Sequence, residues 1–499
     1  MSSNEKVEEA GTASRIVRNA SYMMMSQLAT WSMTIVFVVI VPRFLGSGNF
    51  GQFTLAESIW LIASIVAFFG IETHLTKTIA RNPAKLSILY SSSVINTTFN
   101  FVITFGGVLL FSWISGYQTA QIQLIALVGI AYYANVISTV SMSVLNGLER
   151  LDTVSKTFTL NKAIHTIFAV GALLLGSGLF QYAIAIVCAY LINCVLMVRA
   201  LYRTHAFKLE FDFATSVDLY KSGLPYFFSG IFAILYKEFD IIIMSWLIQE
   251  PEQFGFYGTA DRLAQTLMFV PTVLITALFP VLSRMHGEGS DLLPIYIGKS
   301  FNILLVLSIP IGLGVSVIAE PVILLFYGPE YIDAAKILEV LGFVVILTYQ
   351  TTLLGYFLIS IDKQNIWTIT MAVATVATIP LDLILIPWAS SFGPAGVGGA
   401  FAYLFTEGGM VIVGLYLIPK GYINKSNYIL ALKAIISGAV MYTALTYLDD
   451  LGFVAKIFLG GAIYPAMILL LRTIPKDDMD LLKTLFEPVT NRLPFFRSG

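Results

Sequence analysis

Long apolar stretches constrain this chain more than any other feature. Fourteen of them follow one another, each about 18 to 25 residues long, and short polar loops separate them. A bilayer core about 30 Å thick requires roughly 20 helical residues for one crossing, and every backbone amide must be bonded within the helix. The pattern predicts an all-α polytopic membrane protein with 14 transmembrane helices. The expected spans are 20–41, 53–70, 88–111, 122–145, 158–175, 179–197, 224–248, 257–282, 301–319, 337–361, 366–388, 397–418, 428–447 and 454–471.

Composition and charge narrow the class of protein. Hydrophobic residues make up 57% of the chain and charged residues 12%, which is far from a soluble globular composition. A net charge of -1 without a basic run gives no basis for nucleic-acid binding. Cys188 and Cys194 fall within one expected span, and no His and Cys cluster has the spacing of metal ligands. We therefore expect neither disulfides nor a bound metal.

Basic residues in the loops predict the orientation. Nearly all loop Lys and Arg fall on the side of the two termini, whereas the opposite side has only Arg43, Lys336 and Lys456. Basic loops stay in the cytoplasm during insertion, so both termini are expected there, in a multi-pass protein of the cell membrane. Residues 1–19 would form a cytoplasmic N-terminus. Residues 472–499 alternate apolar and charged side chains, which favours an amphipathic helix on the cytoplasmic face.

An internal repeat suggests how the spans are grouped. The stretch from Asn49 to Glu57 and the stretch from Gln253 to Asp261 share Phe-Gly, an aromatic residue two positions later, and Ala followed by an acid. They mark the entrances to the second and eighth spans. Two parallel six-helix units follow from this register, related by an axis along the membrane normal. The predicted organisation is an N-lobe at 20–200, a cytoplasmic linker at 201–222, a C-lobe at 223–418, and two extra helices at 428–471.

The sequence resembles the oligosaccharide flippases of the polysaccharide transporter family, in the superfamily that also holds multidrug extruders and lipid II flippases. The resemblance covers nearly the whole chain and rests on Pro42-Arg43-Phe44-Leu45-Gly46, Lys221-Ser222-Gly223-Leu224-Pro225 and Pro280-Val281-Leu282-Ser283-Arg284. It implies two six-helix bundles, alternating access, and transfer of a polyprenyl-(di)phosphate-linked oligosaccharide to the outer leaflet. The implied partners are that glycolipid, the bilayer and other glycan-assembly proteins. No cofactor is implied, and transport would be coupled to a proton or sodium gradient.

Ionisable residues inside the expected spans are the candidates for the cargo or ion-binding cavity, because an ionised group at the bilayer centre costs roughly 2.5 to 3.5 kcal/mol. Glu57 and Asp261 form the sharpest pair, since the repeat places one in each lobe. They could bind a coupling proton or cation, or hydrogen-bond sugar hydroxyls. The alternative is local pairing near the interface, with Arg262 as the partner of Asp261.

A second group lies in the fifth span. Lys162, His165 and Thr166 share a helical face through their i, i+3 and i+4 spacing. A cation at that position could compensate the charge of a cargo diphosphate. The alternatives are that Lys162 snorkels to the interface and that His165 is a packing residue. Further candidates are Lys237 and Asp240 in the seventh span, Asp382 in the eleventh and Glu407 in the twelfth.

Two other functions remain open at this point. A cation-coupled multidrug extruder would share the repeat and the buried carboxylates, but extruders usually stop at twelve helices. A membrane glycan polymerase or ligase would need a large outer loop with acid and base residues. The longest expected outer loop, about 320–336, has no evident acid/base pair. We therefore expect a transporter and not an enzyme.

Overall fold

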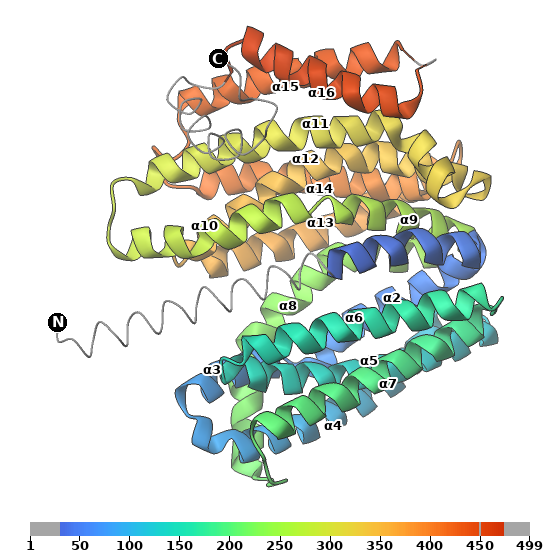
Figure 1. The fold of residues 1–499 in the computed structure, drawn as a ribbon, viewed down its shortest axis with the longest axis vertical. Coiled ribbons are helices and arrows are strands. Elements are labelled where there is room, and N and C mark those ends of the chain that lie inside the picture. Colours follow the sequence, from blue (N-terminus) through green and yellow to red (C-terminus); the bar gives the residue numbers. More distant parts are fainter. Residues whose placement is uncertain (1–29, 449–450, 474–499) are drawn as a thin grey trace, which may run out of the picture. The chain divides into compact units, whose positions relative to one another are not determined.

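The computed structural model describes residues 30–448 and 451–473, and every regular element within them is helical. A helix at Thr30–Leu45 is followed by α2 to α16 (Figure 1). Their bounds are α2 Ser47–Phe68, α3 Ile71–Arg81, α4 Leu86–Ile114, α5 Thr119–Gly147, α6 Leu151–Leu174, α7 Leu179–Thr204, α8 Phe213–Leu247, α9 Pro251–Thr266, α10 Phe269–Gly287, α11 Leu293–Tyr327, α12 Ile332–Ser360, α13 Gln364–Ser390, α14 Gly396–Leu417, α15 Lys425–Thr446 and α16 Phe453–Leu470, with short 3₁₀ turns η1 Pro83–Lys85 and η2 Pro329–Tyr331.

The helices confirm the predicted all-helical membrane fold. Twelve helical stretches of the described residues are long and apolar enough to cross a membrane. The shorter Thr30–Leu45 helix and α8 occupy the positions of the first and seventh expected spans, and α8 carries several charged residues along its 35 residues. The cytoplasmic N-terminus at 1–19 and almost all of the predicted amphipathic tail at 472–499 lie outside the described residues.

Helix α3 is an element that the sequence analysis did not predict. The chain turns sharply between α2 and α3, where Phe69 and Gly70 have φ of 52° and 70°. Gly70 is required there, because an added Cβ would lie 2.4 Å from the carbonyl oxygen of Gly223. The turn redirects a short amphipathic helix whose Ile71 and Leu75 are fully buried. Eleven residues are too few for a membrane crossing, so hydropathy alone could not reveal α3.

The eighth span is divided into α9 and α10. Pro271 has no backbone N–H, so it cannot bond the carbonyl of Leu267 one turn earlier. The Tyr349 hydroxyl of α12 donates to that Leu267 oxygen at 2.7 Å. The same oxygen also accepts from the Val270 N–H at 3.4 Å, so a neighbouring helix and a tighter local turn together replace the bond that the proline cannot make.

The chain forms two compact units. Unit 1 comprises Met1–Leu263, Ile323–Ala334 and Thr368–Ala402, as far as these residues are described. Within it α4, α5, α6 and α7 run side by side (Figure 1), and α2 packs on α5 and α8. Its core includes Trp60, whose indole N–H donates to the Ile125 carbonyl at 2.7 Å and whose ring stacks on Phe101. These contacts fix α2, the helix that carries Glu57.

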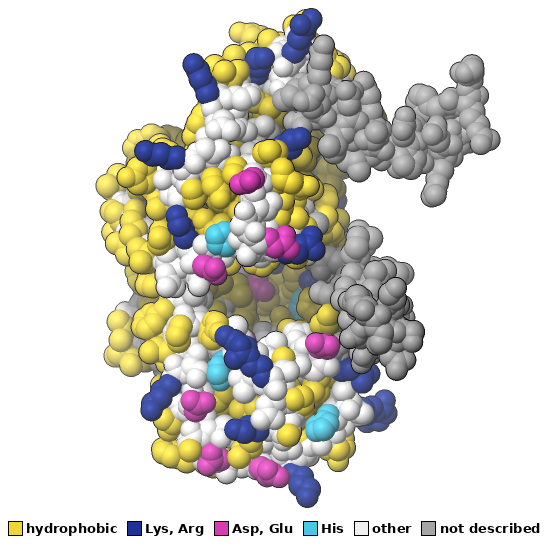
Figure 2. Space-filling model, turned by 90° about the vertical axis from the view of Figure 1, so that its left-hand side faces the viewer, with side chains coloured by type: hydrophobic (Ala, Val, Ile, Leu, Met, Phe, Trp, Pro, Cys, Tyr) yellow, Lys and Arg dark blue, Asp and Glu magenta, His cyan; other side chains and the backbone are white. Residues whose placement is uncertain are grey.

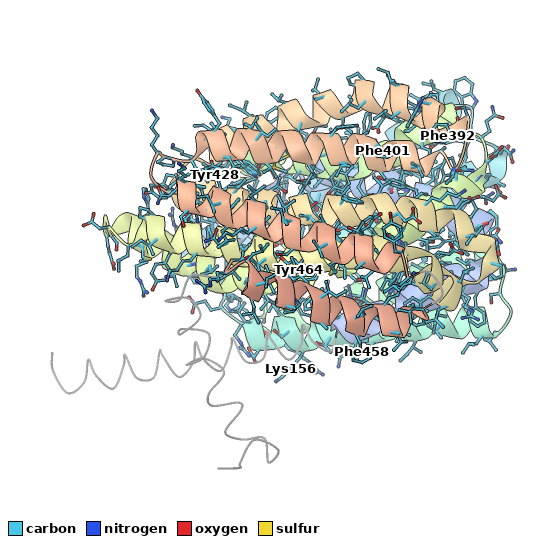
Figure 3. The ribbon with its side chains drawn as sticks, turned by 90° about the horizontal axis from the view of Figure 1, so that it is seen from above. Lys156, Phe392, Phe401, Tyr428, Phe458 and Tyr464 are labelled. Atoms are coloured by element: carbon cyan, nitrogen blue, oxygen red, sulfur yellow. The ribbon has the colours of Figure 1, made fainter. Side chains whose placement is uncertain are left out.

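Unit 2 comprises Ala264–Val322, Ala335–Trp367 and Tyr403–Gly499, as far as described. Small residues bring its helices close together: a Cβ on Gly312 of α11 would lie 2.3 Å from the Gly342 oxygen of α12. Helix α15 packs on α16, and Figure 3 labels Tyr464 and Phe458 of α16. Tyr464 is buried whereas Phe458 is 75% exposed. Apolar exposure of this kind is expected for a helix surrounded by lipid.

Basic side chains gather in and just after α3 of unit 1. Figure 2 looks onto the side of Figure 1 at which α3 lies and shows Lys and Arg side chains on the surface. Lys77, Arg81 and Lys85 in and after α3 are all exposed. The distribution agrees with the loop charges from which the orientation is predicted.

Candidate functional site

The two copies of the repeated Phe-Gly sequence meet in unit 1. A Cβ on Gly51 would lie 1.8 Å from the Pro251 oxygen and 2.8 Å from the Gly255 nitrogen, and a Cβ on Gly255 would lie 2.1 Å from the Ser47 oxygen. Helices α2 and α9 therefore approach each other as closely as their backbones allow. The contact sets the spacing of the charged side chains that follow it on each helix.

An ion pair joins these two helices next to that contact. The Arg262 guanidinium of α9 donates from Nη2 to Glu57 Oε2 of α2. The guanidinium also lies over two rings, 4.8 Å from the Phe50 centroid and 5.9 Å from that of Phe37. Both members of the ion pair are largely buried, with exposed side-chain fractions of 18% and 28%. The pairing of two buried ions with aromatic faces stabilises charges that would be costly alone.

The predicted Lys162 and His165 belong to the same cluster. Lys162 Nζ lies 5.5 Å from the Phe37 centroid, on the ring that Arg262 also contacts. The His165 ring packs 5.1 Å from Phe37 and 5.4 Å from Tyr190, and its Nδ1 is buried without a hydrogen-bond partner. Two cations and an imidazole therefore surround one phenyl ring. We call Phe37, Glu57, Lys162, His165 and Arg262 the cation cluster.

Tyrosines on α5 and α7 complete its surroundings, and the sequence analysis did not identify them. Tyr132, Tyr182 and Tyr190 all lie within electrostatic range of Glu57 and Arg262. The Tyr182 hydroxyl is buried without a hydrogen-bond partner. The sequence feature that could have identified them is the presence of tyrosines in otherwise apolar spans. Their hydroxyls can bond a polar cargo without adding charge.

A pair of carboxyl groups forms a second polar centre of unit 1. Asp240 of α8 and Asp382 of α13 lie within side-chain hydrogen-bonding range of each other, and both are buried. Neither oxygen of Asp382 has another partner, while Asp240 Oδ2 accepts from the Tyr257 hydroxyl at 2.9 Å. Two adjacent carboxyl groups in an apolar interior cannot both be ionised. This carboxyl pair can share a proton.

A hydrogen bond also connects α8 to the helix of the cation cluster. Ser58, the residue after Glu57, donates to Glu238 Oε2 at 2.8 Å. The predicted Lys237, the residue before Glu238 in α8, is exposed. Asp261 lies between the two centres on α9 and within electrostatic range of Asp240. Unit 1 thus brings together most of the predicted site residues.

Glu407 belongs to unit 2. Its carboxylate accepts from the Thr351 hydroxyl of α12 at 2.6 Å, and its side chain is buried. The adjacent Gln350 is buried with neither amide atom bonded. This pair of helices holds a polar contact of its own.

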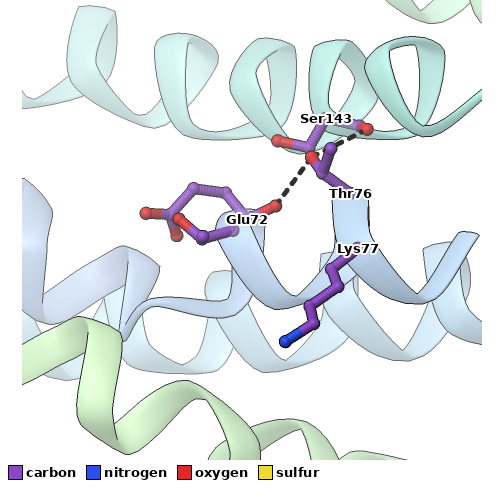
Figure 4. A pocket seen from close by; sticks show the side chains of 5 residues that line it. Glu72, Thr76, Lys77 and Ser143 are labelled. Atoms are coloured by element: carbon purple, nitrogen blue, oxygen red, sulfur yellow. Dashed lines mark hydrogen bonds between the residues drawn. The ribbon is translucent and has the colours of Figure 1, made fainter. Parts of the chain in front are cut away.

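A separate pocket of about 390 Å³ lies between α3 and α5 (Figure 4). Glu72, Thr73, Thr76 and Lys77 of α3 line it together with Ser143 of α5. The Thr76 hydroxyl lies 3.1 Å from the Glu72 carbonyl oxygen and 3.0 Å from that of Ser143. Burial raises the pKa of the Glu72 carboxyl, since removal from water disfavours the ionised form.

Comparison with known proteins identifies the family. Residues 16–286, more than half of the chain, match the polysaccharide biosynthesis protein family. This chain belongs to that family. Residues 225–384 also match the MatE family, which confirms the expected superfamily.

Relatives and solved structures agree with this membership. The chain is 24% identical over 372 residues to the probable low-salt glycan biosynthesis flippase of Haloferax volcanii, covering 74% of this chain and 76% of the relative. It is 26% identical over 244 residues to the lipid II flippase of Bacillus subtilis, covering 45% and 44% of the two chains. The fold is similar to a lipid II flippase in an inward closed conformation, with a TM-score of 0.70, 14% identity and coverage of 91% and 99%. An inward-facing multidrug transporter gives a TM-score of 0.61, with 16% identity and coverage of 81% and 97%.

Proposed function

We propose that this protein flips a polyprenyl-(di)phosphate-linked oligosaccharide across the cell membrane for glycan biosynthesis. Its family, and relatives whose names describe flippases, support a transporter rather than an enzyme. The observation that carries the cargo proposal is the cation cluster, because a diphosphate can cross an apolar interior only if cations compensate its charge. Arg262 and Lys162 supply two such cations around Phe37.

Glu57 gives this cluster a resting state. In this state its carboxylate forms an ion pair with the guanidinium of Arg262. An arriving phosphate offers more acceptor oxygens and more charge to the same guanidinium, so it would displace Glu57. Lys162 and the nearby tyrosine hydroxyls would bind the remaining oxygens. The cargo would enter from the cytoplasmic side, to which we assign both termini. Other glycan-assembly proteins would deliver it there.

The carboxyl pair of Asp240 and Asp382 would couple transport to a proton gradient. Two carboxyl groups that share one proton can take up a second and release it when the surrounding helices move. We propose a proton as the coupling ion, because two adjacent buried carboxyl groups can bind and release it without further ligands. Proton uptake and release by this pair would then couple the gradient to binding and release of the cargo.

The test uses purified protein in liposomes and a polyprenyl diphosphate that carries a fluorescent disaccharide. A membrane-impermeant reductant quenches only the fluorophores in the outer leaflet, so it reports transfer between leaflets. We expect Arg262→Ala and Lys162→Ala to reduce the rate at least tenfold. Arg81→Ala, which removes an exposed arginine of α3, serves as the matched control and should retain the rate. Equal rates for wild type and Arg262→Ala would refute the proposal.

A multidrug extruder is the second candidate, because the MatE match at 225–384 includes both members of the carboxyl pair. In that case liposomes with an imposed proton gradient would accumulate a cationic dye, and the glycolipid would not change leaflet. Dye transport that requires Asp240, together with absence of glycolipid transfer, would replace the flippase proposal.

A further inference from the structure

We propose that Tyr257 is the positioning residue that links the carboxyl pair to the cation cluster, so that protonation at Asp240 and Asp382 controls the Glu57–Arg262 ion pair. This inference rests on the proposed function and adds the coupling element between its two centres. Tyr257 does not contact the cargo in this scheme. It acts through the helix on which it lies.

Helix α9 carries contacts to both centres. Its Tyr257 hydroxyl donates to Asp240 Oδ2 at 2.9 Å, and its Arg262 pairs with Glu57. The two residues are five positions apart on one helix without interruption, which is about 7.5 Å along the axis. A shift of α9 that breaks one contact therefore moves the other. The centres are joined by rigid backbone and not by a chain of loosely packed side chains.

The phenol ring is held in place. Tyr257 is only 4% exposed, and a Cβ on Gly399 of α14 would lie 3.4 Å from its Cε2. The glycine therefore leaves room for a methyl group beside the ring, and what holds the ring is its burial together with the hydrogen bond to Asp240. Because the ring has little freedom, its hydroxyl cannot follow Asp240 unless α9 moves as well.

A further hydrogen bond joins α2 directly to α8. Ser58 of α2 donates to Glu238 of α8 at 2.8 Å, two residues before Asp240 and one residue after Glu57. Helices α2, α8 and α9 are therefore joined pairwise by Ser58–Glu238, Asp240–Tyr257 and Arg262–Glu57. A displacement at any one of the three contacts must be accommodated by the other two.

The charges around Tyr257 determine the direction of the effect. Asp240, Asp261 and Asp382 face its hydroxyl, and Glu238 and Asp261 face Asp240. An ionised Asp240 accepts strongly from the phenol, because a charged acceptor roughly doubles the strength of a hydrogen bond. A proton taken from water onto Asp240 weakens that acceptor while the phenol keeps its own proton. Helix α9 is then released from α8, and Arg262 can leave Glu57 for the cargo.

The experiment measures glycolipid transfer in the same liposomes with and without a pH gradient. Wild type should be stimulated several-fold by the gradient. Tyr257→Phe removes only the hydroxyl and with it the hydrogen bond that holds α9 to α8. Its rate without a gradient should rise toward the stimulated wild-type rate, and its stimulation ratio should fall to about one. Tyr90→Phe is the matched control, because Tyr90 is also buried and bonds a side-chain hydroxyl, Ser141 at 3.0 Å. It should keep the wild-type ratio.

The other possible outcomes distinguish the role of Tyr257, the role of the carboxyl pair and the proposed function. A wild-type stimulation ratio in Tyr257→Phe would overturn the role of Tyr257 and leave the flippase intact. Wild-type transfer that no gradient stimulates would overturn both the carboxyl pair and Tyr257, and absent transfer would remove the proposed function itself. Asp240→Asn provides a second variant, since it keeps an acceptor for Tyr257 but cannot take up a proton. Because its amide oxygen is a neutral, weaker acceptor, like the protonated acid, this variant should also lose stimulation, with a rate without a gradient that lies above that of wild type.

Discussion

Replacement of Gly51 by alanine tests the closest contact of the fold. The new methyl would start 1.8 Å from the Pro251 oxygen, whereas non-bonded heavy atoms settle at about 3.5 Å. Helices α2 and α9 would have to separate by roughly 1.5 Å, because backbone atoms cannot rotate away as a side chain can. Overpacking of this kind costs about 1 to 3 kcal/mol. That is a factor of about 5 to 150 in the equilibrium between packed and separated helices.

The assay is the apparent melting temperature of the detergent-solubilised protein at one fixed scan rate, since membrane proteins often unfold irreversibly. Gly107→Ala is the matched control: Gly107 lies within α4, and an added Cβ there meets no atom within 4 Å. Alanine at such an open helical position should be neutral or stabilising by about 0.5 to 1 kcal/mol. We expect a clear fall for Gly51→Ala and none for Gly107→Ala. Equal melting temperatures would show that the backbone contact does not hold the two helices together.

Three further changes test separate parts of the structure. Glu72→Gln should remove a pH dependence of stability. Because the pKa of this carboxyl is raised in the folded protein, its ionisation lowers the free energy of unfolding as pH rises above the unfolded pKa of about 4.3. The melting temperature should therefore change less between pH 4 and 8 in the variant than in wild type. Tyr349→Phe removes the shorter of two hydrogen bonds to the Leu267 carbonyl and leaves the one from the Val270 N–H, so it should cost about 0.5 to 1.5 kcal/mol. The loss should appear as faster backbone hydrogen exchange at the α9/α10 break, and unchanged exchange would count against the capping role. Gly129→Ala would place a methyl 2.4 Å from Trp60 Cζ2 and should lower the melting temperature and shift the tryptophan emission, whereas an unaltered spectrum would contradict the packing.

The arrangement of helices could be predicted because the bilayer imposes one rule on every crossing. Residues that cannot bond their backbone to water must form helices of nearly fixed length, and hydropathy records this directly. Helix α3 escaped prediction because its 11 residues mix apolar and charged side chains. The division of the eighth span was partly foreseeable, since Pro271 predicts a kink. Its capping by Tyr349 was not, because that residue is 82 positions away from Leu267.

Site residues could be named from the sequence, but their partners could not. The cost of charge within a bilayer singles out Glu57, Arg262, Asp240 and Asp382 wherever they occur in a span. The sequence analysis considered Arg262 as a partner for its neighbour Asp261, whereas the structure pairs it with Glu57, 205 residues earlier. Pairings of this kind depend on which helices pack together. A single sequence does not show which helices pack against each other.

The meeting of Gly51 with Gly255 has a further meaning. In a symmetric homodimer, a residue on the two-fold axis touches its own copy in the other subunit. Here the two corresponding residues of the repeat touch within one chain, with Pro251 on one side of the contact and Ser47 on the other. A dimer must accept every mutation at such a position twice, whereas a fused chain can change one side alone. The freedom to differ is already visible further along the two helices, where Glu57 and Asp261 are corresponding acids but Ser58 corresponds to Arg262, so that only one copy supplies the cation that pairs with Glu57.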